Sequence, residues 1–497
     1  MQALNQKIRE ISQNILNNSQ NFLWKNLVFY GFIILLSGYF INSLVIKREF
    51  HDYIFAEWFI HYRSGFVRRG LGGHILLFLQ DNYSINAGLV LTGLSYFIFL
   101  MFSIFYVLKV KQYKKYIDLE SLLVLLFLPV LILFPANTRV IVGRKEFLFF
   151  LSLLANLWLV HQALTPIIRD NLDISNQRKF IDSYSLKLGL IYNLISVPTT
   201  LTHEAILFLS LPLNLIITSS VLSLQFFPLK SLKRTIMIYA PTLVVSVICL
   251  FFKGNKNIAL AICESWQKYS HLYPELMADC NQEMYGVLKF FQISTLEAIQ
   301  EVIEMNILQD HGMSFVLWIF GFTINLILLM RMSFRVLDSF INRYSRQNNP
   351  IDPSIHTQSN SIEVFTRFSF KYILLPFIGT GILYVIALDW GRWLFITAIS
   401  YVLCLLTPSL VQLETLHSHS THWMLTCLSP LYLVYKKAVY WIYSQAFVEK
   451  FYPAYLSLFL YTLFFFKFPH FDIKIYNIYP PYLWGIIKKM IKFSINY

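Results

Sequence analysis

Charged residues are scarce in this sequence. Only 14% of its 497 residues are charged, whereas an ordinary soluble domain has about 25%. Hydrophobic residues make up 56% of the chain, and they recur in apolar runs of about 20 residues, the length of a membrane-spanning helix. This composition excludes a soluble globular protein and predicts an all-α, polytopic bundle of transmembrane helices.

Several common site motifs are also missing. The five cysteines include no Cys-x-x-Cys pair, so a zinc knuckle is not indicated. The glycine-rich stretch GFVRRGLGG lacks the Gly-Lys-Ser/Thr of a P-loop, and it is not a dinucleotide-binding fingerprint. We detect no internal repeat of the kind that many secondary transporters contain. A nucleotide site and an inverted-repeat transporter are therefore not what the sequence favours.

Acidic residues are outnumbered, with 27 Asp and Glu against 41 Lys and Arg, for a net charge of +14. Most of the cations lie in short connections between apolar runs, for example in KVKQYKKY, as the positive-inside rule describes for cytoplasmic loops. Anionic membrane lipid explains this excess, and no nucleic-acid partner is expected.

The apolar runs predict 11 to 13 spans in a single integral-membrane domain, residues 1–497, with the order of spans left open after residue 407. A cytoplasmic N-terminus defines three connections: a first outer loop at 47–85, a long outer loop at 252–313 and a cytoplasmic linker at 331–371. We expect a membrane-lying helix in GLGGHILLFLQ and a short helix in STLEAIQEVIEM. Cys263 and Cys280 share the long loop, where a disulfide forms if that side is oxidising.

Compact groups of mixed charge lie at the span ends that this topology places outside. They are Asp52, Glu57, Arg63, Arg68, Arg69 and His74 in the first outer loop, then Arg139, Arg144, Lys145 and Glu146, then His203 and Glu204, then Asp389 and Arg392. Each group taken alone has a simpler explanation, such as a salt bridge or a helix cap. Because short connections keep all four groups near the bundle, we expect them to converge on one polar cavity.

The residue types in these groups suit a phosphate-bearing ligand. Arginine presents a planar fork that matches phosphate oxygens, and lysine adds a point charge. Charge is costly near a bilayer, which favours a ligand as the reason for the cluster. A carboxylate within it would do acid–base work.

The layout resembles the GT-C superfamily of membrane glycosyltransferases, which use lipid-linked sugar donors. The resemblance lies in REFHDYIFAEWF, where an acidic residue follows the first long span and opens an extended outer loop, and in the many further spans with a second, longer outer loop. It implies that Asp52 takes the place of the family's acidic catalytic residue, with Glu57 in reserve. The groups GFVRRGLGG, GRKE, THE and DWGR are also similar to those of uncharacterised bacterial envelope polysaccharide proteins.

The resemblance implies transfer of a sugar from a polyprenyl-(di)phosphate-linked donor to a glycan or lipid-linked acceptor at the periplasmic face of a bacterial inner membrane. The substrate- and phosphate-binding candidates are then Arg63, Arg68, Arg69, His74, Arg139, Arg144, Lys145, Glu146, His203, Glu204, Asp389 and Arg392. No metal ligand is assigned and no cofactor is certain, although a divalent metal is left open. Two alternatives remain: a polymerase or ligase of O-antigen or capsule repeat units, and a transporter or flippase of an anionic lipid-linked sugar.

Overall fold

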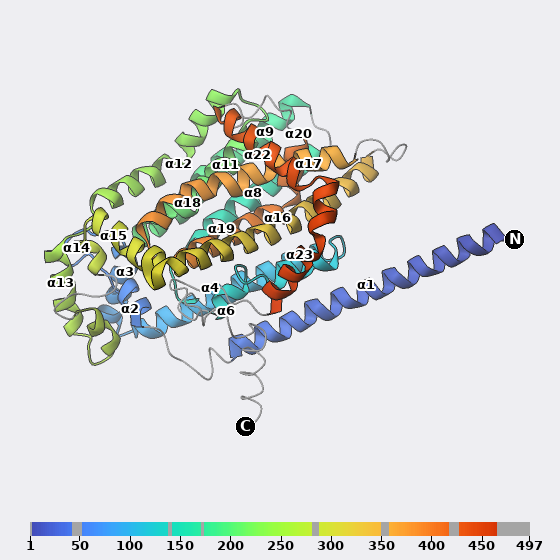
Figure 1. Cartoon of the computed structure of the whole chain (residues 1–497). Coiled ribbons are helices and arrows are strands. Elements are labelled where there is room, and N and C mark those ends of the chain that lie inside the picture. Colours follow the sequence, from blue (N-terminus) through green and yellow to red (C-terminus); the bar gives the residue numbers. More distant parts are fainter. Residues whose placement is uncertain are drawn as a thin grey trace.

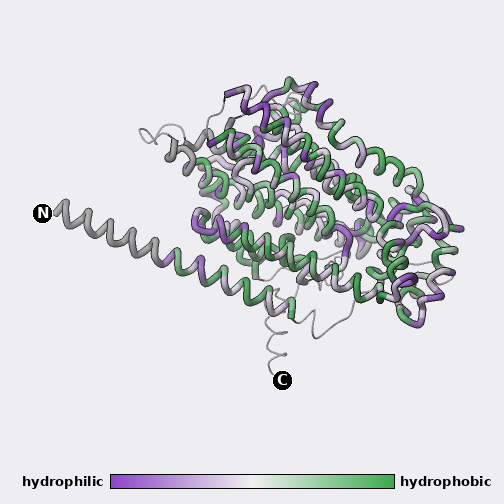
Figure 2. The backbone as a smooth tube through the Cα atoms, turned by 180° about the vertical axis from the view of Figure 1, so that it is seen from behind, coloured by the Kyte–Doolittle hydropathy of each residue, from purple (hydrophilic) through white to green (hydrophobic). Residues whose placement is uncertain are grey.

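The regular structure of the chain is entirely helical wherever it is described. The computed structural model describes residues 2–41, 52–137, 142–169, 173–280, 288–348, 357–416 and 427–464, and every regular element in these ranges is a helix. The long helices lie side by side as a bundle (Figure 1). Hydrophobic stretches dominate these helices, and many hydrophilic stretches gather toward the two ends of the bundle (Figure 2). The all-α bundle predicted from composition is confirmed.

Within the described ranges, six helical segments are long and apolar enough to cross a membrane. They are Gln20–Ile41 of α1 (Gln2–Ile41), α4 (Ala87–Tyr113), α8 (Phe147–Arg169), α12 (Pro228–Phe251), Met313–Asn342 of α16 (Met313–Asn348), and Ser361–Ile386. The last of these runs from α17 (Thr357–Ser369) through the π-helical turn η5 (Phe370–Leu374) into α18 (Leu375–Ile386). A seventh span results if α19 (Trp390–Leu405) and α20 (Pro408–Leu416), which meet at a bend of 73°, are counted as one.

These segments are fewer than the 11 to 13 predicted spans because several apolar runs are divided. The run at 120–134 is split between α5 (Leu119–Phe127) and α6 (Leu133–Asn137). Pro129 follows α5 and cannot continue its hydrogen-bond ladder. The run at 205–222 is likewise split, with Pro212 in the first turn of its second helix. Further helices of the bundle are α9 (Ile174–Thr202), α10 (Ile206–Leu209), α11 (Leu211–Leu222), α22 (Ser429–Ile442) and α23 (Gln445–Phe464).

Short helices gather at one end of the bundle, which we call the short-helix end (left in Figure 1). Its elements are α2 (Asp52–Trp58), α3 (Gly70–Tyr83), α13 (Lys256–Gln267), η2 (Pro274–Cys280), α14 (Lys289–Gln292), α15 (Thr295–Val302), η3 (Ile303–Leu308) and η4 (Gln309–Gly312). The helices expected in GLGGHILLFLQ and STLEAIQEVIEM are therefore present. The second begins with a capping box between Ser294 and Glu297.

The polar segment 331–371, expected to be a linker, is largely helical. Helix α16 continues to Asn348 and α17 begins at Thr357, while residues 349–356 lie outside the described ranges. The continuation is held by charge pairing, because Arg331 and Arg335 of α16 both bond to Glu120 at the start of α5.

The long outer loop folds back onto the first outer loop. Trp266 and Tyr273 pack against α2, where Trp266 is completely buried and its indole Nε1 donates a hydrogen bond to the Phe59 carbonyl at 3.1 Å. A disulfide joins Cys263 of α13 to Cys280 of η2, as expected for an oxidising compartment. The two predicted loops thus form one apolar core at the short-helix end.

Helix α3 approaches the end of α2 so closely that only glycine fits at the crossing. A Cβ added to Gly73 would lie 2.1 Å from the Ile60 carbonyl oxygen and 2.7 Å from the Phe59 carbonyl carbon. Both obstacles are backbone atoms, which no side-chain rotation can move.

We expect Gly73→Ala to lower the free energy of unfolding by about 3 kcal/mol, the upper part of the range for overpacking. Gly93→Ala is the matched control, because Gly93 lies in helix α4 with nothing within 4 Å of an added Cβ. Thermal unfolding in detergent measures both. Equal melting temperatures for the two variants would contradict the close approach.

Candidate functional site

Charged side chains from several helix ends meet at the short-helix end. They come from the end of α2, the start of α3, the turn before α8, the turn after α9 and the start of α19. The cluster contains Glu57, Arg68, Arg69, Arg144, Lys145, Glu146, His203, Glu204, Asp389 and Arg392. The four separate groups of the sequence are thus brought together, and we call these ten residues the charged cluster.

Glu57 lies at the centre of the charged cluster, with 1% of its side chain exposed. Its Oε2 accepts a hydrogen bond from Arg144 Nη1 at 2.8 Å, and its Oε1 lies 3.5 Å from His203 Nε2 and 3.8 Å from Arg69 Nη1. Burial alone would raise the pKa of the Glu57 carboxyl, but the positive charge of Arg144 and its neighbours outweighs this and lowers it. Glu57 is therefore held as a carboxylate.

A second carboxylate, Glu146, joins α8 to α19. Its Oε1 lies 2.8 Å from Arg392 Nη1 and 3.3 Å from His203 Nε2. Arg392 also bonds to Asp389, three residues earlier, and its guanidinium lies over the Trp393 ring. Burial opposes ionisation of Glu146, yet the charge of Arg392 and the contact with His203 lower its pKa. His203 thereby stands between two carboxylates, Glu57 and Glu146.

The paired arginines before α3 share one carboxylate. Glu204 accepts hydrogen bonds from Arg69 Nε at 2.8 and 3.0 Å and from Arg69 Nη2 at 2.7 Å, and Arg68 Nη1 lies 3.4 Å away. Burial acts against the charge of Glu204, but Arg69 and Arg68 hold its pKa well below the usual value. Arg69 has a left-handed backbone, with φ of 69°. Helix α3 begins at the next residue, and the guanidinium groups of Arg68 and Arg69 both contact the Glu204 carboxylate.

Lys145 is completely buried and bonds to main-chain carbonyls. Its Nζ donates to Glu57 O at 2.7 Å, to Thr202 O at 3.1 Å and to Arg69 O at 3.4 Å. The ammonium also lies over the Trp58 ring, whose Nε1 bonds to the Gly143 carbonyl. Burial lowers the pKa of Lys145 to about 8. A lysine assigned from sequence to phosphate binding thus ties together the ends of α2 and α9 and the start of α3.

Two of the predicted site residues lie apart from the charged cluster. Arg63 bonds to Asp81 and to the Tyr269 hydroxyl, in a separate group that also includes Lys268 and that fastens α3 to α13. His74 is exposed beside Tyr62. Asp81 was not predicted as part of a charged group, because its partner Lys268 is 187 positions away in the sequence.

The remaining predicted residues cannot be placed. Arg139 lies outside the described residues. Asp52 begins α2, but its side chain is outside the described part of the structure. Their assignments stay predictions.

The open edge of the charged cluster is formed by Arg68, Arg69 and Asp389. Their side chains are 18%, 17% and 18% exposed, whereas the other members are almost fully buried. The cluster has five cationic groups besides His203, against four carboxylates. A site with excess positive charge and two guanidinium forks at its edge can bind an anion. Among the residues that the structure describes, no group of three or more His, Cys, Asp or Glu has a geometry that could hold a metal ion.

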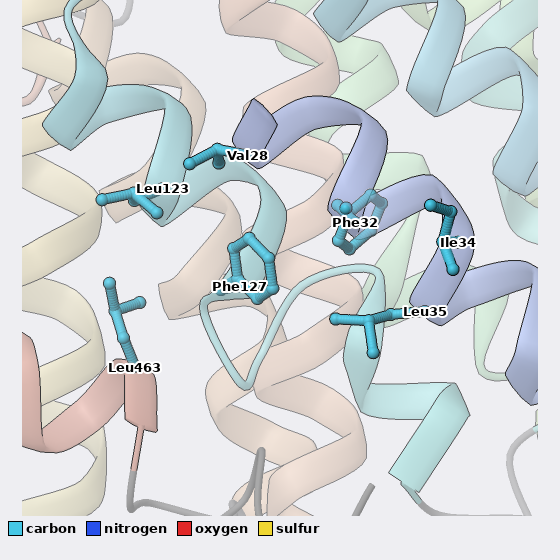
Figure 3. A pocket seen from close by; sticks show the side chains of 8 residues that line it. Val28, Phe32, Ile34, Leu35, Leu123, Phe127 and Leu463 are labelled. Atoms are coloured by element: carbon cyan, nitrogen blue, oxygen red, sulfur yellow. The ribbon is translucent and has the colours of Figure 1, made fainter. Parts of the chain in front are cut away.

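An apolar groove lies elsewhere, between α1, α5 and α23 (Figure 3). It has a volume of 410 Å³, and all its lining residues are apolar: Val28, Gly31, Phe32, Ile34, Leu35, Leu123, Phe127 and Leu463. None of them belongs to the charged cluster. The groove has the chemistry of a site for a hydrocarbon chain.

One family model matches the chain, over residues 27–279, and its description is "Uncharacterised membrane protein Rv1490". The match covers three of the four groups, from Glu57 through Glu204, and ends before Asp389 and Arg392. No curated protein and no solved structure matches the chain.

We expect Lys145→Ala to lower the free energy of unfolding by about 3 kcal/mol, because it leaves buried carbonyls and carboxylates without a cation. Lys111→Ala, at an exposed position in the last turn of α4, is the control and should change stability by less than about 0.5 kcal/mol. Denaturant unfolding of the two purified variants makes the comparison. Wild-type stability of Lys145→Ala would show that the ammonium does not tie these helix ends together.

Proposed function

The chain belongs to the Rv1490 family of uncharacterised membrane proteins, and from that premise we propose that it is a membrane glycosyltransferase of the GT-C type. It transfers a sugar from a polyprenyl-(di)phosphate-linked donor to a glycan or lipid-linked acceptor at the periplasmic face of a bacterial inner membrane. The observation that carries this proposal is the charged cluster, where five cationic groups converge with buried carboxylates at the ends of membrane helices.

The donor phosphate binds at the open edge, beside Arg68 and Arg69. Glu204 holds the Arg69 guanidinium through two of its nitrogens, so this fork is oriented before the donor arrives. Partial burial strengthens the attraction between guanidinium and phosphate, since less water screens it. Arg144 is paired with Glu57, and Arg392 is paired with Glu146. These two arginines add positive charge deeper in the charged cluster, which also attracts the phosphate.

Asp52 serves as the general base. It opens α2 five residues before Glu57, about 7.5 Å along the helix axis. The acceptor hydroxyl oxygen attacks the anomeric carbon, its proton passes to the carboxylate, and the bond from that carbon to the phosphate oxygen breaks. The arginines stabilise the charge that grows on the departing phosphate. Glu57 is the reserve base, which would first have to release Arg144.

The apolar groove supports a lipid-linked donor. A polyprenyl tail is a hydrocarbon chain, and every side chain around the 410 Å³ groove is apolar (Figure 3). A polymerase or ligase of repeat units would use the same anion site and differ in product length.

A flippase of an anionic lipid-linked sugar is the second candidate, and one observation favours it. Transporters place charged residues and broken helices within the membrane, and the bent pair α19–α20 carries Glu414, buried against Lys371. Movement of donor without turnover, in vesicles containing the purified chain, would favour this candidate.

We expect Asp52→Asn to lower kcat for sugar transfer by at least about a hundredfold, the contribution of a positioned base. Glu57→Gln should have a smaller effect on kcat and a larger one on stability, because it removes a charge facing Arg144. Transfer of labelled sugar from a polyprenyl phosphate donor by purified protein measures both. Full turnover in both variants would refute the assignment of the base.

We expect Arg68→Gln to raise the KM for the lipid-linked donor by about tenfold to a hundredfold, because a charge-assisted hydrogen bond contributes about 1.5–3 kcal/mol. Arg63→Gln is the matched control, since its guanidinium is bonded to Asp81 outside the charged cluster. Donor titrations at two salt concentrations compare the variants. The proposed phosphate position is wrong if both arginines change KM equally.

A further inference from the structure

A buried ion pair lies within the spans, outside the charged cluster. Lys371 Nζ lies 2.8 and 3.0 Å from the two carboxylate oxygens of Glu414, and both side chains are 0% exposed. The Tyr372 hydroxyl donates a hydrogen bond to Glu414 Oε1 at 2.8 Å. Lys371 belongs to the span Ser361–Ile386, and Glu414 belongs to α20 of the bent pair.

Stability does not explain such a pair. Removing an ammonium and a carboxylate from water costs several kcal/mol per ion, and apolar side chains of the same volume often stabilise as well or better. Ionisable residues within membrane helices commonly mark proton or ion sites. Lys371 and Glu414 therefore call for a functional explanation.

The backbone is irregular at both partners. Lys371 lies in the π-helical turn η5, and such turns are frequent at functional sites. Glu414 lies in α20, which follows the 73° bend after α19. Irregular backbone at membrane depth is tolerated where protein or water satisfies its polar groups.

Three charged side chains lie in a row along one helix, from the bundle surface to the Lys371–Glu414 pair. Glu363, Arg367 and Lys371 are spaced four residues apart along α17 and η5, so they follow one face of the helix. Glu363 is partly exposed and bonds to Lys436 at 2.6 Å. Arg367 thus lies between the partly exposed Glu363 and the buried Lys371 along this helix.

Polar groups continue beyond the pair toward the short-helix end. The Ser220 hydroxyl of α11 bonds to Tyr372. Thr218, Asn214 and Ser210 follow back along α11 and its N-cap, all buried. Asn214 bonds to Ser210 and to Asn156 of α8. This buried polar stripe ends near Phe149, beside His203 of the charged cluster.

We propose that Lys371 and Glu414 form a proton-binding site, in which a proton from water at the Glu363 end joins the Glu414 carboxylate and releases it from Lys371. The lysine keeps its proton, and Tyr372 remains the neighbour that can hydrogen-bond to the neutral acid. The titratable and charged groups on the elements packed around the pair include Arg367, Tyr372, Tyr401, Cys404, Tyr432, Tyr435, Glu363, Lys436, Arg331, Arg335 and Asp338 of α16, and, near α20, His161. The site does not depend on the proposed glycosyl transfer.

Infrared titration of the purified full-length chain tests the proposal without any reagent that must reach the site. A protonated carboxylic acid in an apolar environment has its own carbonyl band. We expect such a band to grow at least about fivefold as the pH falls from about 9 to about 5, a range that brackets a carboxyl shifted by its surroundings. Glu414→Gln removes the band. Glu120→Gln, which alters a carboxylate paired with Arg331 instead, leaves it unchanged.

The variant Lys371→Met makes the test independent of whether Glu414→Gln folds. Without the ammonium, the Glu414 acid is favoured, so the midpoint of the band should move upward by at least about one pH unit. The proposal is overturned if the wild type shows no band assignable to Glu414 at any pH in this range. It is equally overturned if the band keeps its midpoint in Lys371→Met.

Discussion

The short-helix end depends on mutual neutralisation of charges that water hardly reaches. Glu57 needs Arg144, Glu146 needs Arg392, and Glu204 needs Arg69. Each pair joins segments far apart in the sequence. Because one partner alone would leave an uncompensated buried charge, these helix ends are stable only as a set. Lys145 extends this dependence to the main chain, since its ammonium bonds to carbonyls of three segments. The proposed anion-binding edge follows from that set, because Arg68 and Arg69 are oriented by the same carboxylate that they neutralise.

The sequence predicted the helical class and the convergence of the four polar groups, and both follow from simple physics. Apolar runs must be helical in lipid, and short connections keep charged groups near the bundle. Individual roles were less predictable. Lys145 and Arg63 look alike as loop cations, yet one bonds to buried carbonyls and the other to Asp81. Whether such a cation bonds to a carbonyl, to a carboxylate or to a ligand depends on how the chain folds around it. The described residues contain fewer long apolar helices than the predicted spans, because prolines such as Pro129 and Pro212 divide runs that hydropathy counts as continuous.

The pair Lys371–Glu414 was missed for a related reason. Lys371 is the last residue of the predicted linker 331–371 and Glu414 stands alone in LVQLETL, so neither resembles a motif. Their partnership requires η5 and α20 to meet inside the bundle. The molecule therefore has two charged centres with different properties: one at the short-helix end, with excess positive charge, and one enclosed and balanced. The buried hydroxyl and amide groups of α11 lie between them.

The packing of Trp266 against Phe59 has a consequence for biosynthesis. The two residues are 207 positions apart, so the ribosome needs about 10 to 40 s to make the second after the first. During that interval α2 and α3 have emerged while their apolar faces lack α13 and η2. The apolar faces of α2 and α3 in the nascent chain must therefore contact lipid or the insertion machinery. The Cys263–Cys280 disulfide can form only after this delay.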